Sequence, residues 1–238
     1  MSRRRKVSDV PAPLVDHLRE LRRRVGIALV AVVVGAALTF AWCDTLIALL
    51  RTPLNGTPLY FVGIGDAFGI RMQLSLIGGV GLAMPIWLWQ AWAFISPGLT
   101  DTERRAARPW IPLALLLFAV GVGVAWVVLP FAVGFLLSFA TSDLTPLIAA
   151  DRYFGFVGSL MLVFGLATEY PILLVFLSRV GVVSSAKLRK WRRNAIVFAV
   201  VVGAFATPGT DLVSPIVLSV VLYVLYELSI WLIRAGGR

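Results

Sequence analysis

The sequence predicts an all-α, polytopic membrane protein with six transmembrane helices and both termini in the cytoplasm. Its 238 residues are 59% hydrophobic and only 14% charged, whereas about a quarter of the residues of a soluble domain are charged. Six apolar segments also approach the ~20 residues that a helix needs to cross ~30 Å of hydrocarbon. Only short connections separate them, so residues 1–238 form a single membrane domain. The predicted spans are residues 25–50, 68–95, 110–139, 154–178, 195–206 and 215–233.

The third observation is the placement of the basic residues, which give the chain a net charge of +10. They concentrate before the first span, at 104–108, at 179–193 and in the C-terminal tail, whereas the opposite side holds only Arg51 and Arg152. Positive charge favours the cytoplasmic side, which places both termini there and makes the number of spans even. The basic residues flank membrane spans, so we interpret them as topology signals and not as a nucleic-acid interface.

The elements begin with an N-terminal arm, residues 1–24. Leu14, Leu18, Leu21 and Val25 recur at helical spacing, so we expect the arm to lie along the cytoplasmic interface. The first apolar segment is expected to be a retained helix, because Trp42 is not the small residue that signal cleavage requires. The residues before it are too few for an organelle transit peptide, which favours a prokaryotic cell membrane.

The later elements carry fewer local signals. Trp87, Trp89 and Trp92 predict an aromatic belt at the cytoplasmic end of the second span. The fifth span, Ala195–Ala206, is only about 18 Å long at ~1.5 Å per residue, and we expect the last two helices to be short. Lipid around so short a helix is expected to thin, or the helix to lean on its neighbours.

Signatures of enzymes and cofactor sites are sparse. The chain has no GxxxxGK loop for ATP phosphates, and its only histidine, His17, lies in the N-terminal arm. The GIGD stretch at Gly63–Asp66 is similar to the GxGD of intramembrane aspartyl proteases, but no second aspartate lies in mid-span to share a proton with it. We interpret GIGD as a turn, and we expect no catalytic residues, no metal and no cofactor.

Two carboxylates in the cytoplasmic layer have alternative interpretations. Glu20, in DHLRELRRR, has the spacing for a surface pair with Arg24, worth ~0.3–0.5 kcal/mol. Glu103, in SPGLTDTERR, has equivalent neighbours in Arg104 and Arg105. Alternatively, the two glutamates together hold guanidinium groups from another chain through charge-assisted hydrogen bonds.

A third carboxylate, Glu169, lies within the apolar stretch GLATEYPILL. A charge at this depth costs about 2.5–3.5 kcal/mol on insertion scales, so such residues usually face a partner or a pathway. A structural alternative is that Glu169 satisfies backbone left unpaired by Pro171. Arg71 is expected to reach the outer head groups, Asp211 to cap the last helix, and Glu227 has no preferred interpretation.

Four stretches together resemble the TatC family, the multispan receptor subunit of the twin-arginine protein translocase. They are HLRELRRRV, PIWLWQAWAFISPGLTDTERR, ATEYPILL and TPGTD, and the resemblance extends over about residues 14–234. It implies a receptor that binds twin-arginine signal peptides of folded cargo and recruits single-span TatA- and TatB-type proteins. It also implies export driven by the proton motive force, and it leaves self-association open.

The resemblance also implies roles for individual residues. Glu20 and Glu103 match the glutamates that bind the arginine pair, Arg19 and Arg22 belong to the same stretch, and Phe94 matches a position on which the family relies. Arg22 is expected to orient a glutamate. The residues matching the partner-docking and polar intramembrane positions are Glu169, Thr207, Asp211 and Pro53.

The sequence departs from the family pattern at two places near the docking residues. Ser214 and Pro215 stand where a glutamine often follows the TPxD turn, and Thr168 stands where a phenylalanine often precedes the buried glutamate. Two other functions stay open: a small proton-coupled solute carrier that uses Glu169 and Arg71, and a passive scaffold for partner helices.

Overall fold

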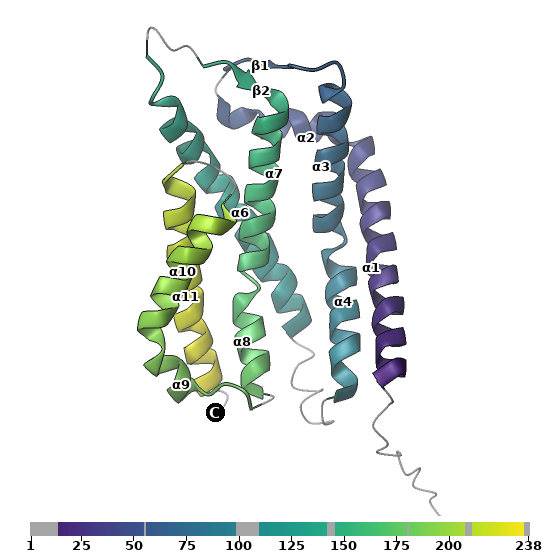
Figure 1. The fold of residues 1–238 in the computed structure, drawn as a ribbon, viewed down its shortest axis with the longest axis vertical. Helices are drawn as coiled ribbons and strands as arrows, with labels where there is room; N and C mark the ends of the chain where they lie inside the picture. The colour runs from purple at the N-terminus through teal and green to yellow at the C-terminus, as the bar shows by residue number, and fades with distance from the viewer. Residues whose placement is uncertain are drawn as a thin grey trace, which may run out of the picture.

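The computed structural model describes residues 14–54, 56–98, 110–141, 146–179, 181–207 and 211–235. Its long helices run side by side in a bundle, and the first turn of α1 lies at the same end as the last turn of α11 (Figure 1). An even number of crossings requires that arrangement. Figure 1 also shows α9 at this end and the strands β1 and β2 at the other, which we call the outer end.

The N-terminal residues differ from the prediction. Helix α1 spans Leu14–Ala41, so residues 14–24 are its first turns and not a separate interfacial arm. No proline or glycine falls between Leu14 and Val25 to interrupt the helix. The predicted first span also ends too late, because the chain turns at Trp42 and α2, Cys43–Leu50, runs across the outer end of the bundle (Figure 1). Asp44 explains the turn, because placing its carboxylate in the hydrocarbon would cost free energy. In α2 the Asp44 side chain is 80% exposed.

The second predicted span consists of two helices, α3 (Asp66–Leu82) and α4 (Met84–Ile95), which bend by 50° at the break between them. Pro85 stands in the first turn of α4, where its missing N–H group leaves no helical hydrogen bond unmade. A short 3-10 turn, η2 (Ser96–Gly98), follows α4. Helix α3 packs closely on α1, because Gly35 and Gly79 let the two backbones meet: a Cβ added at Gly79 would lie 2.6 Å from the Ala36 nitrogen.

The middle of the chain forms the core of the bundle. Helix α6 (Trp110–Leu137) packs against α7 (Ala150–Ala167), which is followed by α8 (Tyr170–Arg179). At the outer end, the 3-10 turn η1 (Thr52–Leu54) follows α2, and strand β1 (Leu59–Tyr60) pairs in parallel with β2 (Ile148–Ala149). The Tyr153 hydroxyl donates to the Leu50 carbonyl at 2.7 Å, which fixes α2 to the top of α7.

The last part of the chain comprises α9 (Ser185–Lys190), α10 (Arg192–Ala206) and α11 (Val213–Ala235). Helix α10 is short, as predicted: 15 residues give about 22 Å. Helix α11 is longer than expected, because it extends to the basic residues near the C-terminus and its 23 residues suffice for a crossing. Figure 1 shows the upper ends of α10 and α11 below the level of β1 and β2.

The predicted number of six spans is only partly accounted for by helix length and hydropathy. Among the described residues, four helices are long and apolar enough to cross a membrane, and the bent pair α3–α4 makes a fifth. The four candidate crossings are Asp16–Ala41, Trp110–Leu137, Ala150–Arg179 and Val213–Ala235, of which the third includes the break between α7 and α8. Helix α10 falls below the length of a standard span.

Candidate functional site

The end that holds the first turn of α1 and the last turn of α11 is strongly basic, and we call it the basic end. Figure 1 shows the segments of α1, α8, α9, α10 and α11 that lie at this end, and each of these helices contributes basic residues there. The described ones are Arg19, Arg22, Arg23, Arg24, Arg179, Lys187, Arg189, Lys190, Arg192, Arg193 and Arg234. An acidic side chain at this end is therefore surrounded by basic side chains.

Glu20 lies where α1 meets α4 and is held by Arg24. The Arg24 guanidinium donates to Glu20 Oε1 from Nε at 3.0 Å and also from Nη2, and its Nη1 donates to Gln90 Oε1 at 3.3 Å. The local pair that the spacing allowed is therefore present. The same guanidinium links α1 to α4, and because both bonds go to Oε1 they fix the direction of the carboxylate.

A ring contact lies beside this carboxylate. His17 of α1 and Phe94 of α4 stack with centroids 4.4 Å apart and planes inclined by 22°. The two helices run in opposite directions, so His17 pairs with Phe94 and Arg24 pairs with Gln90, with Glu20 between them on the same face of α1. The structure thus brings together two predicted site residues, Glu20 and Phe94, in one seam between α1 and α4.

Of the other predicted residues of this site, the structure describes Arg19 and Arg22. Arg19 is exposed and pairs with Asp16 at 3.2 Å, and Arg22 is exposed. The arginine that orients Glu20 is Arg24 and not Arg22. Glu103 lies outside the described residues.

Glu169 lies in a second place, at the break between α7 and α8. It lines a cavity of about 260 Å³ whose walls come from α4, α6, α7 and α8. Its Oε1 atom is buried and has no hydrogen-bond partner among the described residues. The structural interpretation, in which this carboxyl group satisfies nearby backbone, therefore receives no support at Oε1.

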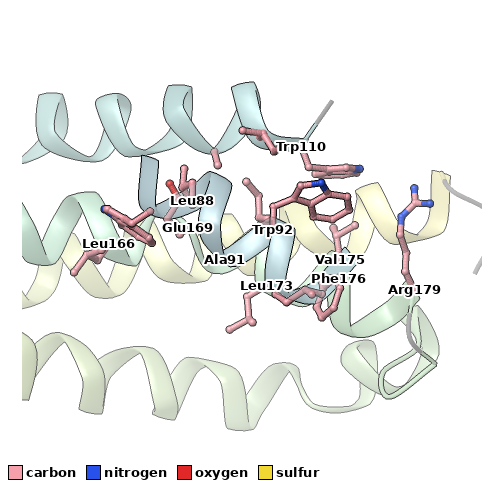
Figure 2. Close-up of a pocket in the computed structure, with 15 residues that line it drawn as sticks. Leu88, Ala91, Trp92, Trp110, Leu166, Glu169, Leu173, Val175, Phe176 and Arg179 are labelled. Carbon is pink, nitrogen blue, oxygen red and sulfur yellow. The ribbon is translucent and has the colours of Figure 1, made fainter. Parts of the chain in front are cut away.

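The cavity around Glu169 is otherwise apolar and aromatic. Figure 2 shows Glu169 toward one end and Arg179 at the other, with Trp92 and Trp110 between them. The Arg179 guanidinium carbon lies 5.9 Å from the centroid of the Trp110 ring, within the range of a cation–π interaction. A carboxyl group with an unused acceptor in such walls can receive a donor from a second molecule.

Thr168 explains why the chain tolerates the break beside Glu169. Its hydroxyl lies 2.8 Å from the Leu117 carbonyl and 2.7 Å from the Gly165 carbonyl, so it anchors the break to α6. A Cβ at Gly121 of α6 would lie 2.4 Å from this hydroxyl oxygen, so only glycine allows that approach. The residue that departs from the family pattern thus has a packing role.

The remaining predicted docking residues do not form one site with Glu169. Thr207 and Asp211 are buried at the turn between α10 and α11, whereas Pro53 lies in η1 at the outer end. Asp211 Oδ1 accepts the Ser214 N–H at 2.6 Å, so Asp211 caps α11 as predicted. Its Oδ2 atom and the Ser214 hydroxyl are buried without partners among the described residues.

Two further charged groups have local partners. Arg71 of α3 makes an ion pair with Asp44 of α2 at the outer end. Glu227 of α11 accepts from Arg192 at 2.7 Å and from the Tyr223 hydroxyl at 3.1 Å, which ties α10 to α11. Arg71 is absent from the walls of the Glu169 cavity, so the structure gives no support to a carrier site built from both residues.

Sequence reasoning missed several of these contacts. His17 and Gln90 had no signal, because their partners lie on a helix far away in the chain. The role of Thr168 was hidden for the same reason. The Arg24 pair did have a signal in its i+4 spacing, and the alternative derived from that spacing is confirmed.

Comparison with known proteins identifies a matching family. The family model "Sec-independent protein translocase protein (TatC)" matches residues 16–220. The TatC protein of Frankia casuarinae is 37% identical over 244 residues, which cover 96% of this chain and 67% of that protein. The TatC protein of Deinococcus radiodurans is 38% identical, with 94% and 86% covered, and that of Aquifex aeolicus is 36% identical, with 95% and 96% covered.

A solved structure has the same fold. The crystal structure of a twin-arginine translocase receptor, TatC, superimposes with a TM-score of 0.80 at 34% sequence identity. The match covers 93% of this chain and 100% of that chain.

Proposed function

Because the chain belongs to the TatC family, we propose that its basic end is a receptor site for twin-arginine signal peptides, with Glu20 and Glu103 as the binding carboxylates. Membership of the family makes the protein a core subunit of the twin-arginine translocase and a multi-pass protein of the cell membrane. The family is named for protein translocation, and the proposed role requires no catalytic residue. The receptor description of the solved relative supports the same role here.

The observation that carries the proposal is the position of Glu20 in the α1–α4 seam. Arg24 occupies one of its oxygens, Oε1, and turns the carboxylate toward the seam that Phe94 and His17 border. The second oxygen can accept from an incoming guanidinium, whose planar fork suits a carboxylate better than a lysine ammonium does. Phe94 offers a ring surface beside the same carboxylate, on which a guanidinium can stack.

Glu103 is proposed as the second carboxylate because of its place in the chain. It follows Phe94 by nine residues. At ~3.3–3.6 Å per residue, a segment of this length is long enough to bring the Glu103 carboxylate to the seam. Two carboxylates at the seam match two adjacent arginines of a signal peptide. The surrounding positive charge repels cationic segments that lack the matching geometry, and Arg19 and Arg22 contribute to that repulsion.

The polar groups buried in the membrane are proposed to dock single-span partners of the TatA and TatB type. The unpaired oxygen of Glu169 in its cavity supports this role for that residue. Thr207 and Asp211 are proposed as a second polar docking position, where α10 ends and α11 begins. Pro53, in η1 at the outer end, is proposed for the same role. We propose that the protein recruits such partners and uses the proton motive force, as the resemblance to the family implies.

The test is the binding of fluorescent signal peptides to the purified full-length protein. A peptide with two arginines is expected to bind more tightly than the same peptide with two lysines. Replacing both Glu20 and Glu103 with glutamine should remove this preference. Asp16→Asn is the matched control, because Asp16 is an exposed carboxylate of the same helix.

Two results would contradict the proposal. An arginine preference that survives the double replacement rejects the two carboxylates as the site. Equal binding of both peptides by the unchanged protein would instead favour a passive scaffold, which has no selectivity for peptides.

A further inference from the structure

The connection between β1 and α3 at the outer end is apolar and exposed. Phe61 is 64% exposed, Val62 is 82% exposed and Ile64 is fully exposed. Residues 61–65 contain no charged side chain, and two of the five are glycine. Large apolar side chains that stand out together mark an interaction surface. We call this segment, Phe61–Gly65, the outer loop.

Asp66 holds the outer loop in shape. Its Oδ2 atom accepts the N–H groups of Val62 at 2.9 Å and Gly63 at 2.7 Å. The Asp66 N–H donates back to the Gly63 carbonyl at 3.2 Å, and a Cβ at Gly63 would lie 2.8 Å from Asp66 Oδ1. The GIGD stretch is therefore a turn, as the sequence predicted. It fixes the apolar side chains in an outward position and prevents them from collapsing onto the bundle.

The outer loop continues the exposed apolar face of α3. Ile64 is followed at intervals of four by Phe68, Met72 and Leu76, all of which are exposed. Residues at this spacing lie on one face of a helix. Helix α3 is the outer half of a membrane-crossing pair, so its exposed apolar face meets lipid and the outer loop stands at the top of that face.

The depth of the outer loop follows from its place on the bent pair α3–α4. The loop lies directly before Asp66, the first residue of α3, so it stands at the outer end of a helix pair that crosses the membrane. Arg71 lies one turn deeper than Ala67 and sends its guanidinium to Asp44 of α2 at the outer end.

We propose that the outer loop is a membrane anchor that inserts Phe61, Val62 and Ile64 into the head-group layer of the outer leaflet. Its partner is the lipid surface itself. The rigid turn makes the insertion inexpensive in conformational entropy, because the loop is ordered before it meets lipid. Tyr60, exposed next to it, is suited to the same interface.

The test places a fluorophore at the tip of the outer loop. Ile64→Cys is made in a Cys43→Ala background, labelled with an environment-sensitive dye, and reconstituted at low density into vesicles of phosphatidylcholine and phosphatidylglycerol. Nitroxide lipids labelled at the head group or at carbon 5 of the acyl chain probe lipid contact, and iodide on both sides probes water contact. Asp151→Cys is the control, because Asp151 is exposed and polar at the same end.

The expected result is quenching by nitroxide lipids at least twice as strong at position 64 as at position 151, with iodide quenching reduced severalfold. Adding Asp66→Ala should reduce the difference in quenching between positions 64 and 151, because it releases the turn. The proposal is overturned if iodide quenches both positions equally and nitroxide lipids do not distinguish them. In that case the outer loop is open to water and suited to a protein partner. Peptide binding plays no part in this readout, so the result is independent of the receptor assignment.

Discussion

His17 in α1 and Phe94 in α4 stack face to face, with ring centroids 4.4 Å apart, although 77 positions separate them in the chain. The contact closes the seam beside Glu20. An aromatic pair is worth about 0.5–1.5 kcal/mol beyond its buried area. A double-mutant cycle of His17→Ala and Phe94→Ala, followed by reversible unfolding in mixed micelles, should give a coupling energy of this size. Strictly additive single effects would show that the stack does not stabilise the protein.

Arg24 competes with any arginine that approaches Glu20. Its pair with Glu20 has the i, i+4 geometry and is partly exposed, so it is worth about 0.3–0.5 kcal/mol. Arg24→Gln should therefore tighten the binding of a twin-arginine peptide about twofold, measured by fluorescence anisotropy at low salt. Gln90→Leu leaves the pair intact and should change the affinity less. Weaker binding by Arg24→Gln would mean that the orientation of Glu20 matters more than the competition.

Glu169 is expected to trade stability for function. The Oε1 atom of Glu169 has no partner among the described residues, and burying such an atom in an apolar cavity costs free energy, so Glu169→Leu should raise the midpoint of thermal unfolding in detergent. The same replacement should abolish co-purification of a single-span partner. Glu227→Gln is the opposing control, because Glu227 has two partners and its replacement should lower the midpoint. A lower midpoint for Glu169→Leu would show that the carboxyl group has a structural role.

The contact between α1 and α3 depends on glycine. In Gly79→Ala the new Cβ would meet backbone atoms of Ala36 and Val32 at 2.6 and 2.7 Å, and backbone cannot move aside cheaply. We expect a loss of about 1–3 kcal/mol in the free energy of unfolding. Gly81→Ala, in the same helix, meets nothing within 4 Å and should be neutral or stabilising by up to ~1 kcal/mol. Equal effects of the two replacements would contradict the close approach.

The thiol of Cys43 should be inert in the folded protein. Cys43 is fully buried, and burial raises the pKa of its thiol even though Arg71 nearby opposes the shift. The reactive thiolate is therefore scarce at neutral pH, and it forms only at a pH higher than the one at which an ordinary cysteine loses its proton. Maleimide should label the protein after denaturation in SDS and not before. Rapid labelling of the native protein at pH 7 would contradict the buried position of Cys43.

The parts of the fold that could be predicted are the helices that form long, uninterrupted apolar runs in the sequence. Helix α6 follows directly from its apolar run, and the placement of arginine and lysine correctly predicts that α1 begins at the end of the bundle where α11 finishes. The turn at Trp42 was not predictable in this way, because the apolar run continues through Cys43–Leu50 and only Asp44 interrupts it.

The candidate site was predictable in its residue types and less so in its geometry. The spacing of Glu20 and Arg24 gave their contact correctly, since both lie on one helix. The contacts of Phe94 and Gln90 with α1 depend on how two distant helices pack, which local patterns do not encode. The meeting of Glu20 with Glu103 remains a prediction.

The unbroken course of α1 has a mechanical consequence. Glu20 stands on the same stiff rod that crosses the membrane and touches α3 backbone to backbone at Gly35 and Gly79. Under the proposed receptor role, a pulling force on a signal peptide bound at Glu20 would be transmitted along the whole of α1 to the outer end of the bundle, because no hinge interrupts the helix.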